Sequence, residues 1–188
     1  MIGNDIVDLK QAEKDSNWKR PRFLDKVFTD EEQQLILNSD TPSQIVWLFW
    51  SMKEAAYKIY VQQFAKRFFN PKKLKCSLIS FEKGTVIIEN KSYFTTSEIT
   101  EDFIYTVATL NKKTAFESSC FILENTNYKT QSDSLKNTFL DSFSNEKAFL
   151  KIKKNQLGVP QLFYKNEAVM QSFSLTHHGV YGAYAIST

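Results

Sequence analysis

The chain has 188 residues, 42% of them hydrophobic, and a net charge of +3. This length and composition exclude a disordered chain, and so weak a positive charge does not by itself indicate nucleic-acid binding. No apolar run approaches the ~20 residues of a membrane-spanning helix, and the start MIGNDIVDL, charged from its fifth residue, does not resemble a signal peptide. Cys76 and Cys120 form neither a metal-binding nor a disulfide pattern. We therefore expect a cytoplasmic globular protein with buried thiols.

The first part of the chain predicts strands around two helices. Residues 1–9 read as a strand, and Thr29 and Glu32 form a capping box that starts a helix through about residue 38. Pro42 fits the first turn of a longer helix, which we expect to run to about Phe69. Four strand-like runs follow, at 76–81, 85–89, 92–96 and 103–110.

The remainder of the chain repeats this order in a shorter form. A polar stretch at 125–134 marks a boundary, which we set between residues 125 and 126. A helix at about 134–143 and strands at 149–153, 161–164, 172–175 and 180–186 follow. The expected fold class is therefore α+β: two similar halves, 1–125 and 126–188, form one compact pseudo-duplicated unit. Each half is a helix packed on a small antiparallel sheet, with a ligand cleft between them.

The long helix carries a glutamate in an apolar setting. One apolar stripe comprises Ile45, Phe49, Met52, Ala56, Ile59 and Tyr60, and a second comprises Trp47, Trp50, Tyr57, Val61 and Phe68. A helix that is apolar on both sides is buried on both sides, and Glu54 and Lys58 lie within the second stripe. The ordinary explanation is a solvated i,i+4 ion pair worth ~0.3–0.5 kcal/mol. Among tryptophans, however, a carboxylate needs a compensating cation, either lysine or a metal ion.

A second carboxylate lies on the first strand. Alternation puts Asp5 on the face of Gly3 and Val7, which is otherwise apolar, and Gly3 leaves room for a close approach to the backbone. The ordinary explanation is an aspartate that accepts backbone hydrogen bonds at a strand end. Two carboxylates in apolar company instead favour a hard divalent cation, Mg²⁺ or Mn²⁺. Mg²⁺ keeps waters and takes further ligands from substrate phosphates, which Lys53 and Lys58 could also hold.

These residues together resemble the 4'-phosphopantetheinyl transferase superfamily. Its signature is Gly-x-Asp on a strand and, some forty residues later, an aromatic residue before Lys-Glu-Ala-x-x-Lys on a helix. Here Gly3-Asn-Asp5 is followed, after 44 residues, by Trp50-Ser-Met-Lys53-Glu54-Ala-Ala-Tyr-Lys58. The segment from Arg22 to Glu32 is similar to the one after the first strand in the holo-acyl-carrier-protein synthase type.

A third element is Gly158-Val-Pro160 followed by Ser172-Phe-Ser-Leu-Thr-His177-His-Gly179. It resembles a stretch in which the family's histidine contacts the 3'-phosphate side of coenzyme A, and His177 stands at the matching position. Without the resemblance, a buried histidine bonded to a carbonyl is the simpler explanation. The resemblance covers 1–110 and 148–188 and leaves a linker of about 111–132 uncovered.

The chain departs from the family pattern at several points. Val7 stands where some members have a third acidic ligand, so a water is expected there. The loop 69–73 lacks the glycines often found after the family's helix, which leaves the adenine contacts open. The histidine half also follows the metal half. The chain is therefore either a synthase-like domain with a longer middle or a two-half protein with its halves exchanged.

The resemblance implies transfer of 4'-phosphopantetheine from coenzyme A to a serine of an apo carrier protein, with release of 3',5'-ADP. Mg²⁺ would be held by Asp5 and Glu54, and Glu54, or a water that it orients, would take the serine proton. Lys58 would act with them in catalysis. The implied coenzyme A contacts are Lys53, Lys58, Thr176 and His177.

The implied partner is an acidic acyl or peptidyl carrier protein, for example of fatty acid biosynthesis, recognised by a monomer or small homo-oligomer. Basic residues suited to docking it are Arg20, Arg22 and Lys26, together with Lys19, and a second cluster comprises Lys66, Arg67, Lys72, Lys73 and Lys75. The alternative is a module of the same fold that binds coenzyme A or a carrier protein without catalysis. A nucleic-acid-binding domain is disfavoured because the aromatic residues follow core spacing.

Overall fold

The computed structural model describes residues 1–68, 70–124 and 127–188. The helices are α1 (Leu9–Asp15), α2 (Phe23–Val27), α3 (Asp30–Leu37), α4 (Pro42–Phe64) and α5 (Tyr128–Asp141), with the short 3₁₀ helices η1 (Pro71–Lys73) and η2 (Ser144–Phe149). The strands are β1 (Ile2–Asp8), β2 (Leu74–Leu78), β3 (Lys83–Ile88), β4 (Lys91–Ile99), β5 (Phe103–Thr109), β6 (Phe116–Ile122), β7 (Leu150–Lys154), β8 (Pro160–Tyr164), β9 (Glu167–Ala168), β10 (Phe173–His178) and β11 (Tyr181–Ser187).

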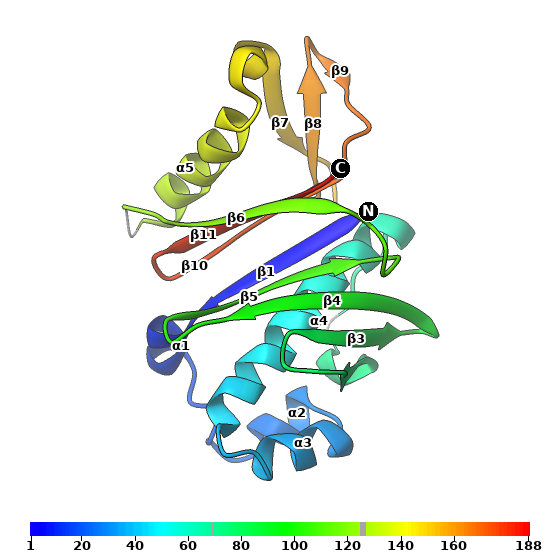
Figure 1. The fold of residues 1–188 in the computed structure, drawn as a ribbon, viewed down its shortest axis with the longest axis vertical. Coiled ribbons are helices and arrows are strands. Elements are labelled where there is room, and N and C mark those ends of the chain that lie inside the picture. Colours follow the sequence, from blue (N-terminus) through cyan, green and yellow to red (C-terminus); the bar gives the residue numbers. More distant parts are fainter. Residues whose placement is uncertain (69, 125–126) are drawn as a thin grey trace.

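The first sheet is antiparallel throughout, in the order β1-β5-β4-β3-β2, and α4 covers one of its faces (Figure 1). The apolar stripe predicted for the long helix forms the centre of this core, because all six of its residues are buried. Helices α2 and α3 close the same core at one end of the molecule. The long helix is thus held on β1, where the first motif lies.

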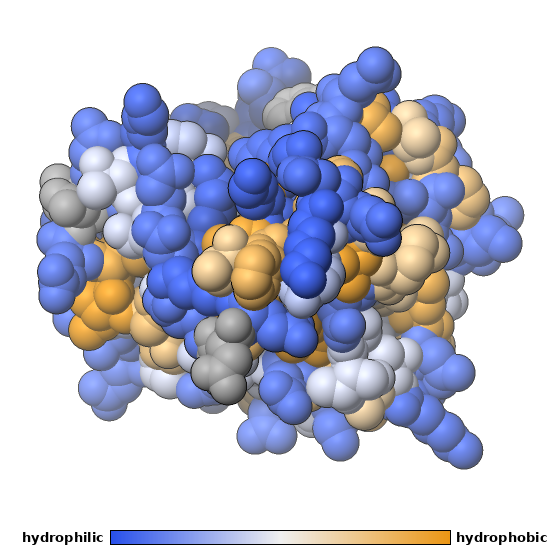
Figure 2. Space-filling model, turned by 90° about the horizontal axis from the view of Figure 1, so that it is seen from above, coloured by the Kyte–Doolittle hydropathy of each residue, from blue (hydrophilic) through white to orange (hydrophobic). Residues whose placement is uncertain are grey.

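The second sheet has the order β10-β11-β6, and α5 packs against it through Phe139, which lies between Phe173 and Tyr184. A third sheet, β7-β8-β9, extends from α5 at the far end of the molecule (Figure 1). Seen from that end, the surface is largely hydrophilic, with hydrophobic residues in separate small groups (Figure 2).

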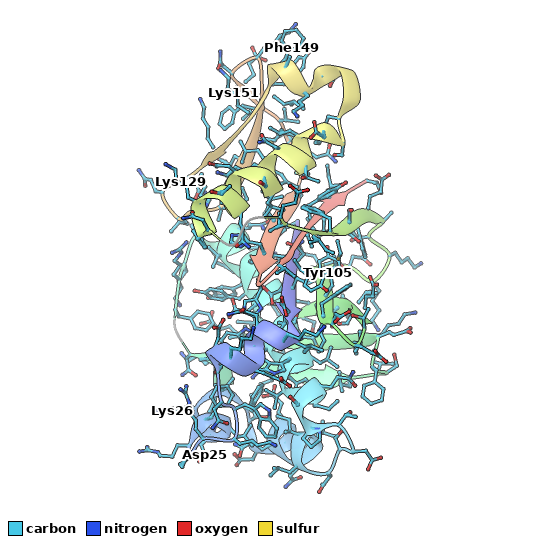
Figure 3. All side chains as sticks on the ribbon, turned by 90° about the vertical axis from the view of Figure 1, so that its left-hand side faces the viewer. Asp25, Lys26, Tyr105, Lys129, Phe149 and Lys151 are labelled. Carbon is cyan, nitrogen blue, oxygen red and sulfur yellow. The ribbon has the colours of Figure 1, made fainter. Side chains whose placement is uncertain are left out.

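The first and second sheets meet along β1, and Tyr105 of β5 is buried between them (Figure 3). The edge of β1 that does not pair with β5 donates its backbone N–H groups to side chains of the β10 segment. Ser172 Oγ accepts from Ile2, Ser174 Oγ from Asn4 and His178 Nδ1 from Asp8, at 3.0–3.1 Å. The residue numbers of the partners increase together along the two strands, so β1 and β10 run parallel and are joined by side-chain hydrogen bonds.

The expected α+β class, with a helix on each antiparallel sheet, is confirmed. The predicted capping box is present at the start of α3, since Thr29 Oγ1 accepts from Glu32 N and Glu32 Oε2 accepts from Thr29 N. The long helix ends at Phe64 with Ala65 in the left-handed region. Phe69, at which we expected it to end, lies outside the described residues.

Six elements were not predicted: α1, α2, β6, β9 and the 3₁₀ helices η1 and η2. β6 pairs with β11 and so belongs with the C-terminal strands, although its residues lie within the expected first half, 1–125. The division between the first and the second sheet therefore falls between β5 and β6. The expected boundary at residues 125 and 126 lies outside the described residues. None of the described helices combines the length and apolar character needed to cross a bilayer.

Candidate functional site

The site begins where α4 crosses β1. A Cβ atom on Gly3 would lie 2.1 Å from the carbonyl oxygen of Ala55, so only glycine allows the helix to approach the strand this closely. Ser51 Oγ, one turn earlier on the helix, donates to the carbonyl of Asp5. This close packing brings Glu54 and Lys58 of α4 beside Asp5 of β1.

Lys58 and Thr176 hold the Asp5 carboxylate in place. Lys58 Nζ lies 3.6 Å from Asp5 Oδ1 and donates to the carbonyl of Asn4 at 2.6 Å. Thr176 of β10 donates its hydroxyl to the same Asp5 oxygen at 3.3 Å. The predicted group of Asp5, Glu54, Lys58 and Thr176 thus comes together from three elements.

The two carboxyl groups are poorly neutralised. Burial raises the pKa of Asp5 to about 7, with Lys58 opposing the shift and the nearby Glu54 adding to it. Burial also raises the pKa of Glu54, again against the effect of Lys58. One partly exposed ammonium therefore faces two largely buried carboxyls, and a further cation here would relieve their mutual repulsion.

The donor set fits a hard divalent ion. Asp5 and Glu54 supply oxygen atoms, which Mg²⁺ prefers, and both line the same cleft. Among the described residues, no group of three or more His, Cys, Asp or Glu side chains is arranged around one metal position. Two carboxylates leave the other positions of an octahedral ion to water or to substrate oxygens, which is how Mg²⁺ is held in phosphate-handling sites.

A basic cleft of about 490 Å³ lies on one side of these residues. Its cations are Lys58, Arg67, Lys136 and Lys154, and its walls come from α4, α5, β10 and the loop at Gly158. His177 also lines it, and burial together with Lys58 lowers the pKa of this imidazole. His177 therefore faces the cleft mainly as a neutral hydrogen-bonding group.

An aromatic cleft of about 560 Å³ lies on the other side. Its apolar wall includes Phe23, Trp47 and Trp50, and Arg20 and Lys26 also line it. The predicted docking residue Arg22 does not line this cleft, and is exposed at the start of α2 with a left-handed backbone. Figure 3 shows Lys26 near the end of the molecule opposite Phe149.

The basic and aromatic clefts share two residues, Glu54 and His177. Asp5 lines only the aromatic cleft, whereas Lys58 and Thr176 line only the basic cleft. The carboxylates therefore stand at the junction of a cationic space and an apolar space, which is where a charged substrate and an approaching second reactant could meet.

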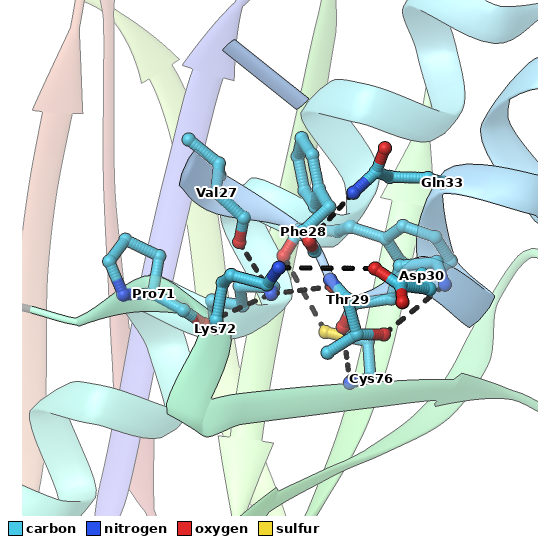
Figure 4. Close-up of polar contacts among 11 residues, drawn as sticks. Val27, Phe28, Thr29, Asp30, Gln33, Pro71, Lys72 and Cys76 are labelled. Atoms are coloured by element: carbon cyan, nitrogen blue, oxygen red, sulfur yellow. Dashed lines mark hydrogen bonds and ion pairs between the residues drawn. The ribbon is translucent and has the colours of Figure 1, made fainter. Parts of the chain in front are cut away.

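Lys53 does not join this group. Its side chain is 2% exposed, and its ammonium donates to Glu32 at 2.7 Å and to the carbonyls of Val27 and Pro71 at 3.0 and 3.1 Å. Val27 and Pro71 are labelled in the close-up of these contacts (Figure 4). All three ammonium hydrogens are used, so none remains for a phosphate. This geometry corrects the expectation that Lys53 contacts coenzyme A.

Three cations of the basic cleft were missed by the sequence assignment of the site. Lys136 comes from α5 and Lys154 from β7, neither of which carries a local signature. Arg67 was noted only as a member of a surface cluster, yet its guanidinium donates to the carbonyl of Leu157 beside Gly158. The positive φ of 73° at Gly158 turns this loop toward Arg67, so the predicted Gly-x-Pro element forms part of the cleft wall.

A family model described as the 4'-phosphopantetheinyl transferase superfamily matches residues 1–108, more than half of the chain. No curated protein matched. Among solved structures, the chain is similar to the holo-[acyl-carrier-protein] synthase of Thermotoga maritima, with 12% identity and a TM-score of 0.45 over 85% of this chain and 80% of that one. The family match, which contains β1 and α4 with Asp5 and Glu54, shows that the chain belongs to the 4'-phosphopantetheinyl transferase superfamily.

Proposed function

We propose that this protein transfers 4'-phosphopantetheine from coenzyme A to a serine of an apo carrier protein in a Mg²⁺-dependent reaction that releases 3',5'-ADP. The observation that carries this proposal is the convergence of Asp5, Glu54, Lys58 and His177 at the junction of the two clefts. Membership of the superfamily supports a transferase of this type.

The basic cleft suits the nucleotide end of coenzyme A, which carries a pyrophosphate and a 3'-phosphate. Lys58 stands beside the carboxylates and would bind pyrophosphate oxygens. His177, largely neutral, would donate a hydrogen bond to the 3'-phosphate, with Lys154 nearby to balance its charge. Thr176 also lines this cleft and donates its hydroxyl to Asp5, which fixes that carboxylate beside Lys58.

Mg²⁺ held by Asp5 and Glu54 would neutralise charge that develops on the pyrophosphate oxygens. In the transfer, the carrier serine oxygen forms a bond to the β-phosphorus, and the bond from that phosphorus to the bridging oxygen breaks, so 3',5'-ADP departs. Glu54 accepts the serine proton, directly or through a water.

The carrier protein would bind on the side of the aromatic cleft. Arg20 and Lys26 line it and Arg22 lies between them in sequence, so an acidic carrier would be attracted to this side. We place the reaction in the cytoplasm, on a carrier such as that of fatty acid biosynthesis. The site takes Asp5, Glu54 and Lys58 from the expected half 1–125 and Thr176 and His177 from the half 126–188, and we propose that it works in a monomer or a small homo-oligomer.

The test is mass spectrometry of an apo acyl carrier protein incubated with this protein, coenzyme A and Mg²⁺. The wild type should add one phosphopantetheine, and Glu54→Gln should slow the addition by about 10²-fold or more because the proton acceptor and a metal ligand are lost together. Glu101→Gln, an exposed carboxylate in a loop, is the matched control and should leave the rate unchanged.

Two outcomes would count against the proposal. No transfer to several carrier proteins, with coenzyme A still bound in calorimetry, would favour the non-catalytic binding module. Full activity of Glu54→Gln would remove Glu54 from the role assigned to it while leaving the transferase itself in place.

A further inference from the structure

Tyr128, the first residue of α5, lies at the wall of the basic cleft. Its ring centroid is 4.9 Å from that of His177, with the planes tilted by 53°. The side chain is 73% exposed. A large aromatic ring therefore stands open beside the residue proposed to bind the 3'-phosphate.

The exposure of Tyr128 sets it apart. All eight tyrosines lie in the described ranges, and each of the others is buried or half-buried. A tyrosine on a helix needs no such exposure for stability, since aromatic rings contribute chiefly by burying apolar area. An open ring at a cleft is instead suited to stacking on a planar ligand.

The composition of the cleft indicates which part of the ligand would meet this ring. Lys58, Lys136, Lys154 and His177 offer positive charge or hydrogen bonds, which suit phosphate groups. The base of coenzyme A is planar and uncharged, so a π face binds it better than an ammonium does. A base joined through one ribose to the 3'-phosphate must lie close to His177, which is where Tyr128 lies.

We propose that Tyr128 stacks on the adenine base of coenzyme A, so that α5 is the element that recognises the nucleotide. This inference rests on the proposed function, because it takes coenzyme A as the ligand. It assigns a base contact to an element that lies beyond residue 108, where the family match ends.

The test is isothermal titration calorimetry with two ligands, 3',5'-ADP and its abasic analogue, methyl riboside 3,5-bisphosphate. Tyr128→Leu should weaken the binding of 3',5'-ADP about tenfold, which is within the range for a base stacked on an aromatic ring. The affinity for the abasic analogue should be unchanged. Tyr128→Phe keeps the ring and should retain wild-type affinity. Because residue 128 is exposed, the wild type, Tyr128→Leu and Tyr128→Phe should all fold alike.

Phe149→Leu provides a matched control in the same half of the molecule. Phe149 is an exposed aromatic residue at the tip of the molecule, outside both clefts (Figure 3). Unchanged binding of 3',5'-ADP by Tyr128→Leu, or equal weakening of both ligands, would overturn the base contact alone. A wild type that binds neither ligand would overturn the contact and the proposed function together.

Discussion

Replacing Lys53 with methionine should destabilise the protein without weakening the binding of coenzyme A. The ammonium is buried and holds Glu32, itself 1% exposed, together with two backbone carbonyls. Removing one partner of a buried ion pair costs about 3–5 kcal/mol, because the other charge is left uncompensated. Glu32 would keep its bonds from the backbone N–H groups of Thr29 and Cys76, so we expect the lower end of that range.

Urea unfolding and steady-state kinetics would measure the two effects separately. Lys53→Met should lower the free energy of unfolding by about 3 kcal/mol and leave the KM for coenzyme A unchanged. The double variant Lys53→Met, Glu32→Gln should regain part of the loss, since no buried charge then stands alone. Lys58→Met is the contrast: it should raise the KM for coenzyme A, and it should also lose stability because Asp5 and Glu54 lose the ammonium that faces them. A raised KM in Lys53→Met at unchanged stability would refute this reasoning.

Three further predictions concern β1. The pKa of Asp5 rises from 3.8 unfolded to about 7 folded, so its stabilising contribution is present below pH 4 and is lost as the pH rises to 7. In thermal unfolding without divalent ions, Asp5→Asn should therefore be more stable than the wild type at pH 8, by at most about 4 kcal/mol. The stabilities of the two proteins should converge near pH 4, and an equal difference at both pH values would contradict this. Gly3→Ala should lose about 3 kcal/mol in urea unfolding, because its Cβ would overlap the carbonyl of Ala55, and a loss below about 0.5 kcal/mol would count against that close approach. Ser174→Ala should cost about 1–3 kcal/mol by leaving the buried N–H of Asn4 without an acceptor, whereas an unchanged urea midpoint would mean that water replaces the hydroxyl.

The metal motifs could be found from the sequence because their spacing is local to two regular elements. Asp5 follows a two-residue alternation and Glu54 a helical one, so each face was predictable from its neighbours. The same periodicity also indicates that Lys53 is buried. It follows Phe49 by four residues and precedes Ala56 by three, which places it at the buried stripe, and Glu32 was already assigned to a capping box.

The rest of the fold depended on contacts that sequence neighbours do not reveal. α1 has seven residues and a single buried one, Ala12, so it has no apolar stripe to read. β6 is an edge strand with no buried residue and no regular polar–apolar alternation, and its partner, β11, lies some sixty residues away in the chain. Tyr128 joins the cleft only because α5 packs on the second sheet.

The side-chain joint between β1 and β10 constrains which insertions and deletions the chain can tolerate. Ser172, Ser174 and His178 face β1 because they occupy alternate positions, and His177 faces the cleft because it lies between them. A deletion of one residue inside this run, between Ser174 and His178, would put the two sides of the deletion out of phase, so that Ser174 and His178 could no longer both face β1. A change of two residues would preserve both faces. Length variation in natural relatives of this segment should therefore occur in even numbers.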